Sequence, residues 1–131
     1  MSTETTKKLS LTDLIGKKVE KEAEKNRTST VYVAGLGGEI EVSNPGERVV
    51  YGIMDMDSTT SENAMYANAK LVYQSVKLFQ EKELQDHYEV VDPIDIVFRL
   101  LKPVEIKLVA EEIMQLAGFS DPEAMRQALK N

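Results

Sequence analysis

The chain has 131 residues, of which 42% are apolar, and its formal net charge is −6. This size favours one domain with one modest core, since such a chain buries roughly two-thirds of its unfolded surface. The absence of cysteine excludes thiolate metal sites and thiol catalysis. The acidic balance argues against a nucleic-acid partner, and no apolar run approaches the roughly 20 residues of a membrane span. The polar opening residues lack the apolar stretch of a secretory signal, so we expect a cytoplasmic protein.

Residues 1–28 have the composition of a mobile N-terminal arm that contains one short helix. Ser10 and Asp13 have the spacing of a capping box, and Leu11, Leu14 and Ile15 form a short apolar stripe behind it. Residues 17–27 are almost all charged, with both signs, which is typical of a solvated linker or helix end. The stripe either docks on the core of this chain or binds a partner. We predict that residues 29–131 form a single globular domain.

A β-hairpin is predicted next. Residues 31–34 favour a strand, residues 39–42 alternate polar and apolar side chains, and the glycine-rich run 35–38 lies between them. A phosphate-binding loop would need a Lys-Ser/Thr pair or a further glycine and a following helix, whereas here a strand follows. A lone hairpin is marginal in water, so it has to pack on helices or pair with another chain.

Two helices are predicted after the hairpin. The first follows the turn at 43–47, and the second follows an apparent capping box that begins at Thr59 and ends at Glu62. The second helix has the strongest periodicity in the chain, and its apolar stripe is formed by Met65, Ala69, Val72, Val76 and Phe79.

Few residues in this region could do chemistry. Asp55 and Asp57 between the helices could contact Mg²⁺, but without a third acid they are better read as a helix end. His87, the only histidine, lies in a short charged helix or turn over 81–88 and is read as solvated. We therefore predict no catalytic, cofactor-binding or metal-binding residues, and no cofactor.

The last third of the chain predicts a helical hairpin with a signal at each boundary. Asp92 can cap a helix that starts at Pro93, and Pro103 can open the next helix. Gly118 can end that helix in a Schellman motif, with Phe119 folding back. Residues 94–101 are apolar nearly all round, which predicts burial on several sides or a docked partner. Asp121 begins a last short helix. The predicted fold is mainly α (α+β), with one β-hairpin followed by a bundle of about five helices.

A family resemblance is carried by the segment from Val91 to Phe119, and above all by Leu100-Leu101-Lys102-Pro103-Val104-Glu105-Ile106. This segment resembles the C-terminal signature of the XkdN-like phage tail assembly chaperones, and residues 9–15 resemble the N-terminus of that family. The order of a hairpin followed by helices is also similar. The turn at 35–38 is shorter than the polar insertion that the family often carries there.

The resemblance implies a function without catalysis. The protein would bind the tape measure protein of a phage or prophage, keep it soluble and help to recruit tail tube subunits. It would act in the host cytoplasm and be absent from the mature virion. Whether it forms a homo-oligomer is left open. The last residues, 129–131, are compatible with a slippery codon run, so a longer product made by programmed frameshifting is a further expectation.

We predict that the partner contacts are Leu11, Leu14, Ile15, Met125 and Leu129. The methionines are either core filling or adaptable contact residues. Two other functions stay open at this point. One is a structural tail or head-tail connector component of the virion, and the other is a small metal-using or phosphate-using enzyme built on Asp55 and Asp57.

Overall fold

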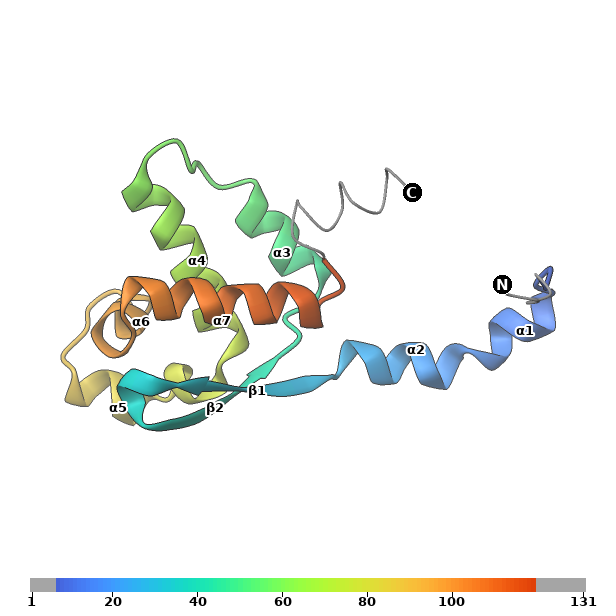
Figure 1. The fold of residues 1–131 in the computed structure, drawn as a ribbon, viewed down its shortest axis with the longest axis horizontal. Coiled ribbons are helices and arrows are strands. Elements are labelled where there is room, and N and C mark those ends of the chain that lie inside the picture. The colour runs from blue at the N-terminus through green and yellow to red at the C-terminus, as the bar shows by residue number, and fades with distance from the viewer. Residues whose placement is uncertain (1–6, 120–131) are drawn as a thin grey trace, which may run out of the picture.

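A computed structural model describes residues 7–119, which form a helical arm joined to a body (Figure 1). The arm consists of α1 (Leu11–Gly16) and α2 (Lys18–Lys25), and the body begins with a hairpin of β1 (Thr28–Val33) and β2 (Gly38–Ser43). The helices that follow are α3 (Glu47–Met54), α4 (Ser61–Ser75), α5 (Lys82–His87), α6 (Asp95–Leu100) and α7 (Pro103–Leu116). This confirms the predicted class, mainly α with one β-hairpin, and five α-helices follow the hairpin within residues 7–119.

The hairpin lies with one face on the helices. Its strands are antiparallel, with Thr28 opposite Ser43 and Val33 opposite Gly38, so β1 begins three residues earlier than predicted. Val33, Ile40 and Val42 are buried on the inner face. Both strands lie against α7, and β2 also contacts α4. The hairpin therefore gains from the helices the support that two strands lack in water.

Glu105 joins the hairpin turn to the start of α7. The strands are connected by a 3-10 turn, η1 (Ala34–Leu36), and by Gly37 in a left-handed conformation. The Gly35 N–H donates to Glu105 Oε2 over 2.9 Å, and the Lys102 N–H donates to Glu105 Oε1 over 2.9 Å. A Cβ at position 35 would lie 2.8 Å from Oε2, so a larger residue there would displace the Glu105 carboxylate. These two backbone hydrogen bonds, that from Lys102 foremost, lower the pKa of Glu105, whose side chain is almost fully buried.

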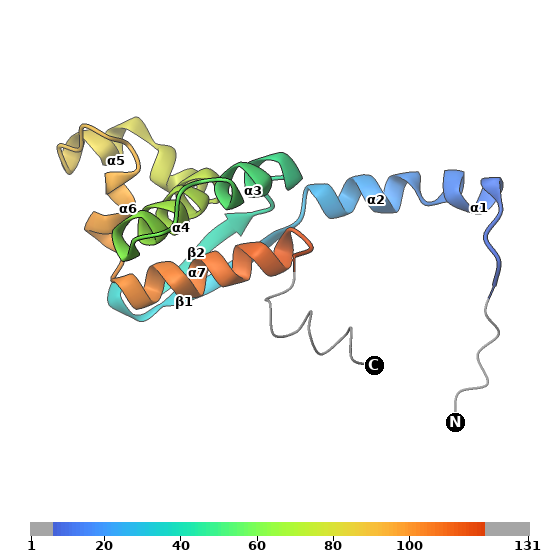
Figure 2. The ribbon, with the colours of Figure 1, turned by 90° about the horizontal axis from the view of Figure 1, so that it is seen from above.

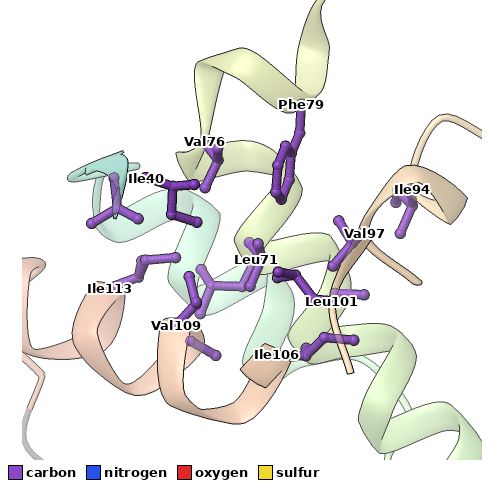
Figure 3. Close-up of a cluster of buried hydrophobic side chains, with 14 of the residues drawn as sticks. Ile40, Leu71, Val76, Phe79, Ile94, Val97, Leu101, Ile106, Val109 and Ile113 are labelled. Atoms are coloured by element: carbon purple, nitrogen blue, oxygen red, sulfur yellow. The ribbon is translucent and has the colours of Figure 1, made fainter. Parts of the chain in front are cut away.

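The core lies between α4, α7 and the hairpin (Figure 3). Leu71 of α4 points toward Val109 and Ile113 of α7, while Ile40 approaches from β2 and Val97 from α6. All of these side chains are buried. The predicted inner face of α7 is confirmed, since Ile106, Val109 and Ile113 are fully buried and Leu116 is partly so.

The prediction that one helix runs from the Thr60 region through Phe79 was wrong. Helix α4 ends at Ser75, Val76 is extended, and residues 77–80 form the 3-10 helix η2 (Lys77–Gln80). The Gln80 side chain donates to the Tyr73 carbonyl over 2.8 Å, which replaces a helical hydrogen bond. Val76 and Phe79 are still buried, because the turn brings them to the core from another direction. An apolar stripe therefore predicted burial correctly but not the helix end.

Two predicted helix starts were also displaced. The cap of α4 is Thr60, whose hydroxyl accepts from the Asn63 N–H, and the expected Thr59–Glu62 capping box was wrong. Asp92 accepts from the Ile94 N–H over 3.1 Å, but α6 begins at Asp95 after a turn rather than at Pro93. The other Asp92 oxygen accepts from the Tyr66 hydroxyl over 2.8 Å, so this carboxylate ties α4 to the start of α6.

The end of α7 follows the prediction closely. Gly118 has φ +90°, and the Phe119 N–H donates to the Met114 carbonyl over 2.8 Å, which is the Schellman hydrogen bond. Pro103 is the first residue of the helix, as predicted. Phe119 meets the ring of Tyr51 edge-on, with 5.6 Å between the ring centroids, and this contact links the end of α7 to α3.

The arm extends away from the body in both views (Figures 1 and 2). Neither α1 nor α2 contains a buried residue, and residues 18–25, predicted as a linker or helix end, are a helix. The proposed division into residues 1–28 and 29–131 stays a prediction. Among residues 7–119 no helix is long and apolar enough to cross a membrane.

We expect Glu105→Gln to lower the free energy of unfolding at pH 7. Because the folded pKa of Glu105 lies below its ordinary value of 4.5, its ionised form contributes stability above that pH. This contribution is lost as the pH falls through the folded pKa, so the difference between the two proteins should narrow in acid. Urea unfolding from pH 7 to pH 3 measures it, with Glu111→Gln on the same helix as an exposed control. A constant difference across this range would contradict the role of the ionised carboxylate.

We expect the backbone amides of α1 and α2 to exchange with solvent far faster than those of α4 and α7. Helices shorter than about 12–15 residues are marginal in water without packing, and the arm helices have six and eight residues. Hydrogen exchange followed by mass spectrometry, on dilute protein at high salt, provides the measurement. Equal protection of α1 and α4 under these conditions would show that the arm is stable by itself.

Candidate partner-binding site

Asp55 is the C-cap residue of α3, and the Asp57 side chain is used in the loop before α4. Asp57 Oδ1 accepts from the Thr59 N–H over 3.0 Å and from its hydroxyl over 2.8 Å, and Oδ2 accepts from the Asn63 side chain over 3.3 Å. The hydrogen bonds from Thr59 lower the pKa of Asp57. Within residues 7–119 there is no group of three or more acidic, histidine or cysteine side chains that could hold a metal ion. This arrangement resembles a loop that caps the next helix.

The other residues considered for catalysis or phosphate binding are His87 and the glycine run at 35–38. His87 is exposed at the end of α5, in a shallow surface hollow that is also lined by Lys82, Glu83 and Asp86. The glycine run at 35–38 is a hairpin turn, as predicted, and its Gly35 N–H is already bound to Glu105.

The start of α1 is built as the sequence predicted. The Ser10 hydroxyl accepts from the Asp13 N–H over 3.2 Å, and the Asp13 carboxylate accepts from the Ser10 N–H over 2.9 Å. The Lys7 ammonium lies 3.1 Å from the same carboxylate. The hydrogen bonds from Ser10 and Lys7 lower the pKa of Asp13, with that from the Ser10 backbone the largest cause. The capping box fixes where the helix begins, and so which side chains share a face.

The arm presents an apolar stripe to solvent. Its side chains are between 57% and 78% exposed, although each is large and apolar. The members of this arm stripe are Leu9, Leu11, Leu14, Ile15 and Val19. The middle three were predicted as partner contacts, which stays a prediction. Val19 was not among them; it lies on α2 and is also exposed.

A second exposed apolar surface lies on the body. Val104 and Leu108 are four residues apart on the outer side of α7, and both are more than half exposed. Leu36 is also exposed, and it belongs to the hairpin turn, next to Gly35, whose N–H is bonded to Glu105 in the first turn of α7. We call these three residues the body patch. The body patch was not predicted, although the spacing of Val104 and Leu108 was a usable signal.

Two further predictions concern other parts of the chain. Residues 94–101, which were predicted to be buried on several sides or docked to a partner, include α6, which buries Ile96 and Val97 and leaves Phe98 exposed. The predicted contacts Met125 and Leu129 lie outside the described residues.

Comparison with known proteins places the chain in a family. The family model described as "Phage XkdN-like tail assembly chaperone protein, TAC" matches residues 6–128. The match covers the arm, the hairpin and all of the described helices. Searches of curated proteins and of solved structures found no match. On the strength of a match over nearly its whole length, this chain belongs to the XkdN-like family of phage tail assembly chaperones.

Proposed function

We propose that this chaperone binds a helix of the phage tape measure protein through the arm stripe and keeps that protein soluble until the tail tube covers it. The observation that carries the proposal is that four large apolar side chains are exposed on two helices that bury none of their own residues, and a fifth, Leu9, is exposed just before them. An amphipathic helix that lays its apolar face on another helix would remove both surfaces from water.

The mixed charge of the arm supports a reversible contact. Lys17 pairs with Glu20 over 3.2 Å, and Lys21 pairs with Glu24 over 3.5 Å, on the exposed surface of α2. Surface pairs of this kind add little stability, so affinity would come mainly from the apolar side chains. Many such contacts along one long partner give strong total binding, and each one can still be displaced.

The body would help to keep the complex with the tape measure protein soluble. The net charge of −6 resists aggregation of a complex coated with many copies. We further propose that the coated tape measure protein recruits tail tube subunits in the host cytoplasm, and that the chaperone leaves before the virion is complete. A longer frameshifted product also stays a prediction, which the codons for residues 129–131 would test.

We expect Leu14→Asp to reduce co-purification with the co-expressed tape measure protein of the same phage by about tenfold or more. Burying a leucine contributes roughly 1.5–3 kcal/mol, and each 1.4 kcal/mol is a factor of ten in affinity. Leu78→Asp is the matched control, because Leu78 has similar exposure but lies on η2. Circular dichroism checks that the body is folded. Normal binding by folded Leu14→Asp would show that the arm is not the contact.

The alternative function, a structural component of the virion, makes a different prediction. We expect quantitative mass spectrometry to detect this chain in infected cells and in tail intermediates, but not in purified mature particles. Copies present in fixed ratio to the tube protein of mature virions would support the structural alternative instead.

A further inference from the structure

Helix α3 exposes two apolar side chains close to the point where the described part of the chain ends. Tyr51 and Met54 are three residues apart, so they share one side of α3, and both are more than half exposed. The adjoining side of the helix faces the core, where Val50 is fully buried and Ile53 is partly buried. We call Tyr51 and Met54 the α3 patch.

The chain leaves the described region beside this patch. The Phe119 ring meets the Tyr51 ring edge-on, and Figure 1 shows the end of α7 next to α3. Twelve residues, 120–131, follow Phe119. The three Cα–Cα steps from Phe119 to Pro122 span at most about 11 Å. A helix that begins at Pro122 would therefore start within reach of the α3 patch of its own chain.

Residues 121–130 have the sequence pattern of a short amphipathic helix. Asp121 and Pro122 are residue types that favour the cap and the first position of a helix. At helical spacing, the apolar side chains after them gather on one side and the polar side chains on the other. The apolar side would comprise Ala124, Met125, Ala128 and Leu129, and the polar side Glu123, Arg126, Gln127 and Lys130.

We propose that residues 122–130 form a helix that docks Met125 and Leu129 on the α3 patch of the same chain. Nine residues of helix are about 13 Å long, and the eight residues of α3 are about 12 Å long, so the two helices match in length. The short connection from Phe119 gives this segment a high effective concentration at the patch. It is therefore favoured as the occupant over a second copy or a separate partner.

The charges near the patch suit this occupant. Asp55 and Asp57 follow α3 directly, and both are exposed. The second half of the segment carries two cations, Arg126 and Lys130. A helix that starts beside Tyr51 and runs toward the end of α3 brings these cations toward the two acids, where opposite charges favour the pairing.

The proposal goes beyond the contact with the tape measure protein and does not depend on it. Met125 and Leu129 would complete the body of the chain, whereas the sequence analysis considered them as partner contacts. The arm stripe would then be left to bind the partner without help from this segment.

Pairs of introduced cysteines test the contact directly, because the chain has no cysteine of its own. A disulfide forms only where two Cα atoms come within about 7 Å. We expect Met54→Cys, combined with Met125→Cys or with Leu129→Cys, to form an intramolecular disulfide under mild oxidation. At least one pair should do so about tenfold or more faster than Leu78→Cys with the same partner. Leu78 is the matched control, since it and Met54 are each 60% exposed.

Non-reducing electrophoresis and mass spectrometry at low protein concentration separate the outcomes. A disulfide that forms only between copies would make the α3 patch an interface between copies and overturn the proposal. Rates no higher than those of the Leu78 control would overturn it as well, and would leave the patch to a separate partner.

Hydrogen exchange provides a second test on a chain without cysteine. A helix of nine residues is marginal in water, so protection of the amides in residues 123–130 would require docking. We expect these amides to be protected in the wild type and Met54→Asp to reduce their protection by about tenfold or more. Met125→Asp, which alters the segment and leaves the body unchanged, should have the same effect. Leu78→Asp should have none.

Two exchange results would contradict the proposal. One is wild-type exchange of residues 123–130 at the rate of an unfolded chain. The other is protection that both Met54→Asp and Met125→Asp leave unchanged, which would place the segment elsewhere. Circular dichroism checks that the body of each variant is folded.

The result is separable from that of the proposed function. Met54→Asp and Met125→Asp both keep the arm stripe, so both should still co-purify with the tape measure protein. Loss of co-purification by Met125→Asp alone would assign Met125 to the partner contact and overturn the proposal. Failure of the wild type to bind the tape measure protein would contradict the proposed function and leave the disulfide and exchange results unaffected.

Discussion

The fold depends on how the hairpin is held to the last helix, and Glu105 makes the connection. Two strands cannot support themselves in water, so this hairpin needs both an apolar face and a fixed position on α7. The core supplies the first through Val33, Ile40 and Val42. Glu105 supplies the second, because one carboxylate accepts both the Lys102 N–H at the helix start and the Gly35 N–H at the turn. A helix cap therefore also sets the position of a distant turn.

The arm and the body differ in how far they bury their apolar side chains. The body buries an apolar core, whereas the arm buries no residue within α1 and α2. Short helices without packing are marginal, so we expect the arm helices to be stabilised by whatever covers them. This property suits an assembly chaperone, which has to bind reversibly. A partner contact that orders the arm costs conformational entropy, and this cost keeps each contact weak.

Several elements could be predicted because their signals are local. The capping box at Ser10, the proline that opens α7 and the Schellman ending at Gly118 each involve residues within one helical turn, and each was placed correctly. The end of α4 was not, because the hydrogen bond from Gln80 to the Tyr73 carbonyl reaches across seven residues. The exposed apolar side chains of the arm could be named in part, but the body patch could not, since exposure of Val104 and Leu108 depends on which side of α7 meets the core.

The sequence by itself determined the class of fold, the type and order of most elements, the inner face of α7 and the resemblance to a chaperone family. Hydrophobic periodicity, helix caps and turn residues each involve only a few neighbouring positions, so they can be recognised without knowledge of the tertiary packing. Only the tertiary structure decided that Glu105 bonds the hairpin turn, that Asp92 ties Tyr66 to α6, and that the arm is held away from the body. These features join residues distant in the chain, and their partners are chosen by packing rather than by sequence spacing.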